Sequence, residues 1–326
     1  MRRDGIVLGL ALLLAALPIF AGSYWVGLMT QALIFGGFAL GLDILVGYTR
    51  LPSLGHAAFF GMAGYGAALA ITRWGLDPWA AAGLGILLAL VVALAFAPLA
   101  VRLRGLTFLT VTLAFGQVVW GLAIRWTSFT GGENGIPGVA RPSLALLGWD
   151  LQSTTGYYWF VLTVATVLTL LVRRLADSPF GLSLLGIRES DMRMSALGYD
   201  VHKRRVAAFV VSAVVGACYG VLSAYFNKFI GPSSLDWRLS AQMLLSVVVG
   251  GGGSLWGPML AGAGIHILKT SLIAETQRWV MVLGFLYVIT VVLLPDGLAS
   301  LPDRLGLRRV FSGLLGGPAS SSGAEK

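Results

Sequence analysis

Residues 78–101 read PWAAAGLGILLALVVALAFAPLAV, a continuous apolar run without a charged side chain. A hydrocarbon core of about 30 Å needs about 20 helical residues to cross it, so this run is long enough for a transmembrane helix. The rest of the chain has the same character, because 57% of its 326 residues are hydrophobic, 11% are charged and its mean hydropathy is +0.83. This composition excludes a water-soluble domain and predicts an integral membrane protein.

Comparable apolar runs recur from one end of the chain to the other. They are continuous, whereas the strands of membrane barrels alternate with a period of two residues, so we expect an all-α fold. We predict about ten transmembrane helices, with nine as the alternative, over residues 6–22, 25–48, 55–71, 78–101, 106–126, 157–172, 206–226, 239–249, 255–272 and 279–294. The eighth segment spans only about 16 Å as a helix, which predicts a short or broken crossing.

One transmembrane domain is expected over residues 1–310, since no linker or change of composition divides it. Residues 173–205 interrupt the apolar pattern with a long polar loop, and residues 311–326 predict a disordered cytoplasmic tail. Arg2 and Arg3 precede the first apolar run as they would in a secretory signal. We favour retention of that run as a helix over its removal as a signal.

The net charge of +9 is explained by topology. With ten crossings and a cytoplasmic amino terminus, most of the 23 Lys and Arg residues fall on the cytoplasmic side, as the positive-inside rule requires. Both termini are then predicted to be cytoplasmic. Binding to nucleic acid is not needed to account for the charge, and the expected surroundings are membrane lipid.

The polar loop contains SPFGLSLLGIRESDMRMSALGYDVHKRR, which begins at Ser178 and carries helix punctuation in the right order. Ser178 can cap a helix with Pro179 at its first position, and Gly198 provides a stop. Glu189 and Arg193 are four residues apart in the orientation that favours a pair on one helix. We predict a short helix outside the bilayer that binds a protein partner. A membrane-surface helix without a protein partner is the alternative.

The same loop resembles the cytoplasmic loop of the membrane permease subunits of branched-chain amino-acid ABC importers. Further blocks match in the expected order: DILVGYTRLPSLGHAAFFGMAGY, VRLRGLTFLTVTLAFGQ with WTSFTGGENGIPG, and LLSVVVGGGGSLWGPMLAG with LLPDGL. The resemblance covers residues 33–298. It implies a permease in a bacterial inner membrane that works with a sister permease, two cytoplasmic ATP-binding subunits and an extracytoplasmic solute-binding protein.

The resemblance also implies roles within the loop. Its helix would be the coupling helix, and Arg188, Glu189, Ala196 and Gly198 match the family's pattern there. The chain has no GxxxxGK[ST] phosphate-binding motif, because the glycine run 250–253 is followed by Ser-Leu-Trp and not by lysine. ATP is therefore expected to be bound and hydrolysed by a partner subunit. The chain itself is predicted to be neither an enzyme nor a cofactor-binding protein.

Two motifs could place polar or irregular backbone along a path through the membrane. Gly250, Gly251 and Gly252 interrupt a helix, which membranes tolerate where the backbone is buried in protein or lines a cavity. A tight turn that lets two helices pack closely is the alternative. In PSLGHAAFFG, Ser53 and His56 are candidates for a broken, polar entry into the third helix. A structural, hydrogen-bonded histidine is the alternative there.

Asp43 and Gln117 are further polar candidates within apolar segments. A carboxylate at a helix centre costs about 2.5–3.5 kcal/mol on insertion scales, which makes Asp43 a functional candidate. Its charge could be compensated by Arg50, seven residues on, or by another helix. The resembling family commonly has Asn and Gly at these two positions. Gln117 either faces the path or bonds a neighbouring helix.

The sequence lacks the motifs of disulfide-bonded proteins, metal-binding proteins and intramembrane enzymes. The single cysteine, Cys218, and three scattered histidines do not predict a disulfide or a metal site. No HExxH motif or paired carboxylates occur within the apolar segments, so an intramembrane enzyme is not expected. The alternatives to a branched-chain amino-acid permease are a urea or amide ABC permease, and a secondary transporter or channel for small polar solutes.

Overall fold

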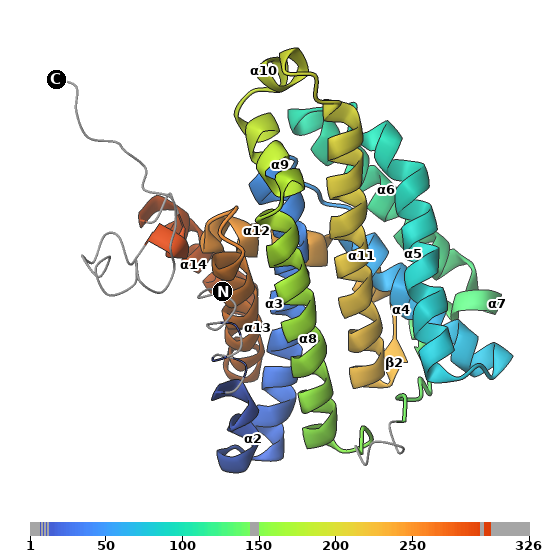
Figure 1. Ribbon diagram of the computed structural model, residues 1–326. Helices are drawn as coiled ribbons and strands as arrows, with labels where there is room; N and C mark the ends of the chain where they lie inside the picture. Colours follow the sequence, from blue (N-terminus) through green and yellow to red (C-terminus); the bar gives the residue numbers. More distant parts are fainter. Residues whose placement is uncertain are drawn as a thin grey trace.

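The computed structural model describes residues 13–143, 150–293 and 297–300, together with Val7, Gly9 and Ala11. These residues form a bundle of helices, and the two short strands recorded among them pair with each other (Figure 1). Ile136 of one strand lies opposite Ile230 of the other in an antiparallel ribbon. The prediction of an all-α membrane protein is confirmed.

Seven helices of 19 to 27 residues make up most of the bundle. They are α3 (Ser23–Thr49), α4 (His56–Trp74), α5 (Pro78–Ala100), α6 (Gly105–Arg125), α8 (Thr154–Ala176), α11 (Val201–Asn227) and α13 (Trp256–Glu275). Five of them, α3, α5, α6, α8 and α11, are long and apolar enough to cross a membrane by length and composition. The predicted segments match these helices to within a few residues, whereas the total of ten crossings stays a prediction.

Shorter elements connect and flank the long helices. The helices are α2 (Leu17–Phe20), α7 (Thr127–Thr130), α9 (Pro179–Glu189), α10 (Asp191–Ala196), α12 (Trp237–Gly250) and α14 (Trp279–Leu293). The 3-10 turns are η1 (Gly132–Asn134), η3 (Pro232–Leu235) and η4 (Leu298–Ser300), and the strands are β1 (Ile136–Pro137) and β2 (Phe229–Ile230). Helix α12 has 14 residues and follows η3, which agrees with a short or broken eighth segment.

The bundle has two distinct ends (Figure 1). Helices α9 and α10 project at one end, which we call the α10 end. Strand β2 and helix α2 lie toward the other, which we call the β2 end. Residues 6, 8, 10 and 12 of the predicted first segment, 6–22, and all of the predicted tail, 311–326, lie outside the described residues.

Close helix packing in the centre of the bundle depends on small residues. A Cβ on Gly37 of α3 would lie within 2.3 Å of ring atoms of Tyr219 on α11, so the tyrosine occupies the space that the glycine leaves. Gly220 of α11 lies against the backbone of Phe60 on α4 in the same way. Without a hydrophobic driving force between helices in lipid, such close contacts are a main source of helix association.

Helix α5 illustrates how an apolar helix acquires an inside and an outside. Ala81, Ala89, Ala93 and Ala97 are buried at multiples of four residues along one face. Large residues occupy the other faces and are exposed: Leu84, Leu87, Leu88, Val91 and Leu94. The helix is therefore sorted by residue size, with small residues against protein and large ones on the surface that a membrane would cover.

The loop helix differs from its prediction in one respect. Instead of one helix from Ser178 to Gly198, the chain forms α9 and α10, separated at Ser190. Ser190 has extended backbone, and its hydroxyl accepts the N–H of Arg193 at 3.3 Å. It therefore caps a new helix and ends the previous one, because serine favours this capping geometry.

Candidate functional site

Helices α9 and α10 form a hairpin at the α10 end. The expected start is confirmed, because the hydroxyl of Ser178 caps α9 by accepting the N–H of Gly181, and Pro179 occupies the first turn. Helix α10 folds back onto α9 where Met194 lies against Gly186. A Cβ at Gly186 would come within 2.6 Å of the Met194 sulfur, so a larger residue there would make the Met194 side chain shift. The hairpin is thus a packed unit.

Apolar side chains cover the tip of this hairpin. Met192 is 83% exposed and Leu197 is 72% exposed, and Tyr199 is also exposed. Gly198 follows α10 with a φ of +85°, a conformation that glycine adopts readily, and reverses the chain toward α11. Exposed apolar residues on a projecting element are typical of a surface that contacts another protein or a membrane.

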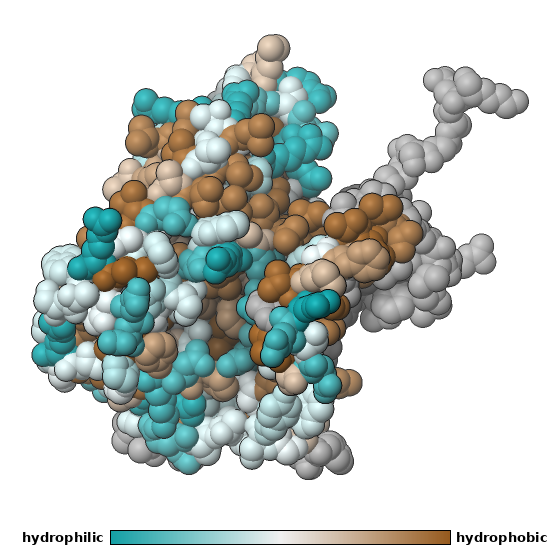
Figure 2. Space-filling view, turned by 180° about the vertical axis from the view of Figure 1, so that it is seen from behind, coloured by the Kyte–Doolittle hydropathy of each residue, from teal (hydrophilic) through white to brown (hydrophobic). Residues whose placement is uncertain are grey.

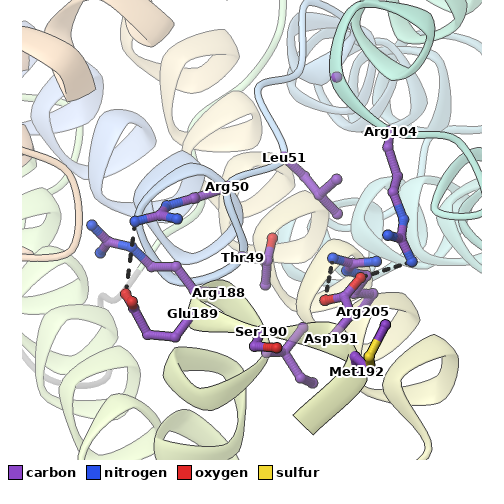
Figure 3. A pocket seen from close by; sticks show the side chains of 12 residues that line it. Thr49, Arg50, Leu51, Arg104, Arg188, Glu189, Ser190, Asp191, Met192 and Arg205 are labelled. Atoms are coloured by element: carbon purple, nitrogen blue, oxygen red, sulfur yellow. Dashed lines mark hydrogen bonds and ion pairs between the residues drawn. The ribbon is translucent and has the colours of Figure 1, made fainter. Parts of the chain in front are cut away.

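A cleft of about 380 Å³ opens beside the hairpin (Figure 3). Residues at the ends of α3 and α6, in the α9–α10 hairpin and on α11 line it: Thr49, Arg50, Leu51, Arg104, Gly105, Ile187, Arg188, Glu189, Ser190, Asp191, Met192 and Arg205. Four of these side chains are arginines and two are carboxylates. The cleft therefore carries an excess of positive charge.

Asp191 connects three helices at one side of the cleft (Figure 3). Its carboxylate lies 2.8 Å from Nη2 of Arg104, just before α6, and 2.8 Å from Nη2 of Arg205 on α11. Arg205 is buried, so this pair is less screened than a surface pair. We conclude that Asp191 fixes the hairpin to the bundle. The sequence reasoning missed this role, because no local pattern distinguishes Asp191 from other charges in the loop.

Glu189 has a different partner from the one expected. It lies 3.7 Å from Arg50, at the end of α3, and both side chains are more than half exposed. The predicted pair of Glu189 with Arg193 within one helix is wrong, because the helix breaks between them at Ser190. An exposed pair of this kind contributes only about 0–1 kcal/mol.

Arg188 reaches from the cleft to the end of α3. Its Nη1 donates a hydrogen bond of 2.6 Å to the carbonyl oxygen of Gly47, in the last turns of α3. The same nitrogen lies 2.9 Å from the position that a Cβ of Gly253 would take. Arg188 therefore touches both the end of α3 and the glycine run between α12 and α13.

Asp43 holds that glycine run from the other side. Its buried carboxylate accepts the N–H of Gly253 at 2.7 Å and the N–H of Leu255 at 3.1 Å. The hypothesis that Asp43 pairs with Arg50 is wrong, because Arg50 pairs with Glu189 at the surface. The alternative, that Asp43 pairs with another helix, is correct in outline. Its partners are backbone N–H groups in the segment between α12 and α13.

The glycine run forms a turn between α12 and α13. Helix α12 ends at Gly250, and Gly251 and Gly253 both have a φ of +90°. A Cβ on Gly250 would lie 2.3 Å from the backbone of Gly257. Leu255 also has a positive φ, +61°, which is uncommon for a residue with a Cβ and costs about 1–3 kcal/mol. The geometry is that of a tight turn with close backbone packing, and a role of Gly250, Gly251 and Gly252 in a path stays a prediction.

Ser53 lies in the non-helical segment that leads into α4, and His56 is the first residue of that helix. The His56 ring bonds Ser53 Oγ through Nδ1 at 2.8 Å and Ser212 Oγ through Nε2 at 3.0 Å. Ser212 donates its proton to the carbonyl oxygen of Gly41 at 2.7 Å, so it must accept from Nε2–H of His56. Both ring nitrogens of His56 thus have hydrogen-bond partners. This is the arrangement expected of a structural histidine, which was the alternative to a role in a path.

Two remaining candidates take no part in these contacts. Gln117 is half-buried on α6, and its role stays a prediction. Ala196 is exposed at the end of α10, near the tip of the hairpin. Asp200 follows the hairpin and caps α11 by accepting the N–H of Lys203 at 3.0 Å. That hydrogen bond lowers the pKa of the Asp200 carboxyl, which keeps it ionised.

The chain is similar in sequence to known transport proteins. The chain is 29% identical to the high-affinity branched-chain amino acid transport system permease protein LivM of Escherichia coli K12, over 90% of this chain and 74% of that protein. It is 28% identical to the Salmonella typhimurium LT2 protein of the same name, with the same coverage. A probable branched-chain amino acid transport permease protein LivM of Methanocaldococcus jannaschii is 26% identical, over 79% of this chain and 72% of that protein.

No solved structure matches the chain significantly. A family model does match, and it extends from residue 24 to residue 294, which includes α3 through α14 and the whole α9–α10 hairpin. The chain therefore belongs to the family of branched-chain amino acid transport system permease components.

Proposed function

We propose that this chain is the transmembrane permease subunit of an ATP-driven importer that moves branched-chain amino acids into the cell. The observation that carries the proposal is the family match over residues 24–294. The α9–α10 hairpin, which projects from the bundle and exposes Met192 and Leu197, supports it. The chain would work with a sister permease, two ATP-binding subunits and an extracytoplasmic solute-binding protein.

The α10 end is assigned to the cytoplasm of a bacterial inner membrane. Arginines gather there, including Arg50, Arg104, Arg188 and Arg205 around the cleft. The positive-inside rule favours a cytoplasmic location for such an end. We expect both termini to be cytoplasmic as well, and the ribbon of β1 and β2 at the opposite end to face the solute-binding protein.

The hairpin is assigned to the ATP-binding subunit. Met192 and Leu197 would leave water when α10 enters a groove on that subunit, and the positive cleft beside them would receive acidic side chains. Burial of one large apolar side chain contributes about 1.5–3 kcal/mol, so a few tip residues are enough to matter for binding. The ATP-binding subunit holds and hydrolyses ATP.

The contacts behind the hairpin give a route for the motion. When ATP closes the partner subunits, α9 moves with them, and Arg188 transfers the displacement to Gly47 of α3 and to the turn at Gly253. Asp43 ties the same turn to α3. The helices around the path then change between inward-open and outward-open states, a two-state equilibrium that nucleotide binding biases.

Reconstitution with the partner subunits tests the function. Proteoliposomes with the complete transporter and its binding protein should accumulate leucine, isoleucine or valine only when ATP is hydrolysed. Accumulation of urea or an amide in place of leucine would favour the other ABC permease, and accumulation driven by an ion gradient without ATP would favour a secondary transporter.

The docking surface is tested separately by substitution at the tip. Leu197→Asp should remove the ATP-binding subunit from the purified complex, because a carboxylate replaces an apolar contact. Leu76→Asp is the matched control, since Leu76 is also exposed but lies in the connection between α4 and α5. Loss of the subunit in both variants, or in neither, would contradict the assignment.

A further inference from the structure

The cleft beside the α9–α10 hairpin contains arginines that retain unused hydrogen-bond donors. Arg50 lies 3.7 Å from Glu189, which is too far for a hydrogen bond. Arg104 lies 2.8 Å from Oδ2 of Asp191, yet that oxygen has no hydrogen-bond partner among the described residues, so the contact is an ion pair without hydrogen-bond geometry. Because a guanidinium carries several N–H donors, both arginines can still donate to a ligand in the cleft.

A third arginine in the wall of the cleft is buried and incompletely satisfied. The side chain of Arg205 is only 10% exposed, and its Nη2 donates to Oδ1 of Asp191 at 2.8 Å. Its Nε is buried and has no hydrogen-bond partner within the part of the chain that the structure describes. A buried donor without an acceptor destabilises a protein, so an acceptor that entered the cleft beside Arg205 would relieve this destabilisation.

Helix α6 begins in the same wall. Gly105, its first residue, lines the cleft, and Arg104 at the capping position accepts no N–H of the helix with its side chain. The first N–H groups of a helix have no acceptor within it and carry roughly half a positive charge, so they favour an anion. The helix terminus and the arginines therefore provide donors of the same sign from independent parts of the chain.

The cleft stays electropositive after its own ion pairs are counted. Arg188 is bonded to Gly47, and the three other arginines face only two carboxylates. In Figure 3, Arg50 and Arg104 lie on opposite sides of the cleft. Its volume of about 380 Å³ is within the range of roughly 300–1,000 Å³ of small-ligand sites. A phosphate fits these donors, because its several oxygens accept from more than one guanidinium and from backbone N–H groups.

The position of the cleft indicates where such a phosphate comes from. Helix α3 ends and helix α6 begins at the cleft, and both are long and apolar enough to cross a membrane, so the cleft lies at the level of the lipid head groups. Leu106, next to Gly105, is 80% exposed, and only 22% of the apolar stretch of α6 is buried. Figure 2 shows hydrophilic side chains at the α10 end and a hydrophobic surface directly below them.

We propose that the cleft binds the phosphate of an anionic phospholipid, whose acyl chains lie against α6. Arg104 and the first N–H groups of α6 contact the phosphate, and Arg50 and Arg205 add donors and charge. Basic pockets between transmembrane helices suit anionic head groups in general. The site belongs to the permease before the ATP-binding subunit docks, because the acidic side chains of that subunit bring the same charge to the same cleft. The inference goes beyond the proposed function.

Binding of defined lipids to the purified full-length permease tests the site. In detergent, native mass spectrometry counts the lipids bound at each concentration of phosphatidylglycerol or phosphatidylcholine. Phosphatidylglycerol should bind about tenfold more tightly at one site, the effect of one charge-assisted hydrogen bond, because the choline of the other lipid cancels the charge of its phosphate. Equal affinity for the two lipids would overturn the proposal.

Substitutions locate the lipid in the cleft. Arg104→Gln should weaken binding of phosphatidylglycerol about tenfold, and Arg104→Lys should weaken it less, since lysine keeps the charge. Arg102→Gln is the matched control, because Arg102 is exposed two residues earlier and does not line the cleft. Equal binding by Arg104→Gln and the wild-type protein would contradict the site, as would an equal loss in Arg102→Gln, which would indicate a general attraction to basic residues.

A second variant covers the case in which Arg104→Gln loosens the hairpin through Asp191. Arg50→Gln removes only an exposed ion pair, which contributes little to stability, so its melting temperature should match that of the wild-type protein. Its affinity for phosphatidylglycerol should still fall severalfold. Unchanged affinity in Arg50→Gln together with unfolding of Arg104→Gln would remove the evidence for a phosphate in the cleft and overturn the proposal.

The source of the phosphate is tested by competition. Inorganic phosphate at the same concentration as the lipid should leave phosphatidylglycerol bound, because it lacks the acyl chains that lie against α6. Displacement at that concentration would assign the cleft to a soluble phosphate and overturn the lipid as its occupant. A permease that supports leucine uptake but binds both lipids equally would keep the proposed function and lose only this site.

Discussion

Arg188 in the polar loop donates from Nη1 to the carbonyl oxygen of Gly47 in α3 at 2.6 Å. The two residues are 141 positions apart in the chain. In the proposed mechanism Arg188 belongs to the hairpin that binds the ATP-binding subunit, and Gly47 belongs to the transmembrane bundle. Arg188 lies in the last turn of α9, which projects from the bundle, and Gly47 lies in the last turn of α3. A charged donor bonded to backbone strengthens the contact, so the hairpin and α3 should move together.

Replacing Arg188 should uncouple ATP hydrolysis from transport. Arg188→Gln shortens the side chain and removes the charge, so the hairpin still binds its partner but no longer pulls on α3. ATP hydrolysis in proteoliposomes should continue while leucine uptake falls. Arg193→Gln is the control, because Arg193 is exposed on α10. Equal uptake by the two variants would argue against the connection.

Gly47 offers a test of close packing with a matched control. A Cβ at Gly47 would lie 2.2 Å from both the nitrogen of Gly253 and Oδ1 of Asp43, and backbone cannot move aside cheaply. Gly47→Ala should lower the free energy of unfolding by about 1–3 kcal/mol, the usual cost of overpacking. Gly83→Ala on α5 meets nothing within 4 Å and should be neutral or slightly stabilising. Thermal melting of the detergent-purified protein measures both.

Asp43 should be replaceable by asparagine but not by leucine. Asp43→Leu leaves the N–H groups of Gly253 and Leu255 buried without an acceptor, at about 1–3 kcal/mol each. Asp43→Asn keeps one acceptor oxygen and should cost less. The yield of folded protein and its melting temperature distinguish the two. Exchange of charges between Asp43 and Arg50 should not restore folding, and rescue by that exchange would revive the pairing that the structure excludes.

The two carboxylates of the cleft should differ in importance. Asp191→Ala removes a carboxylate that bonds buried Arg205 and also Arg104, so the melting temperature should fall clearly. Glu189→Ala removes one exposed pair with Arg50 and should change stability by less than about 1 kcal/mol. A larger loss of stability in Glu189→Ala than in Asp191→Ala would show that burial does not determine how much each ion pair contributes.

Asp200 should confer a pH-dependent stability on the start of α11. Because its pKa is lowered in the folded state, its contribution is present above the unfolded value of about 3.9 and is lost as the pH falls through the lower, folded value. Asp200→Ala should therefore be less stable than the wild-type protein at neutral pH, with a smaller difference in acid. Asp200→Asn retains a good cap without the titration. Melting curves from neutral to acid pH test the difference.

Local signals in the sequence predicted the elements well. Ser178 and Pro179 marked the start of α9 because capping depends only on neighbouring residues. The break at Ser190 was missed, although serine is a good cap, since the loop also had an uninterrupted helical pattern. The partners of Asp43 could not be predicted in the same way. Gly253 and Leu255 are 210 and 212 residues away, and only the folded bundle brings their N–H groups to the carboxylate.

The direct backbone contact around Gly250 has a mechanical consequence. Side chains can rotate to absorb a push, whereas peptide groups cannot, and here Gly250 rests on Gly257 while Gly297 rests on Gly251. Three segments of backbone, around Gly250, Gly257 and Gly297, are therefore in direct contact without side chains between them. A shift of any one segment has to displace the others by nearly the same amount. Mutations that add flexibility here should therefore reduce the displacement that reaches the transmembrane helices before they unfold the protein.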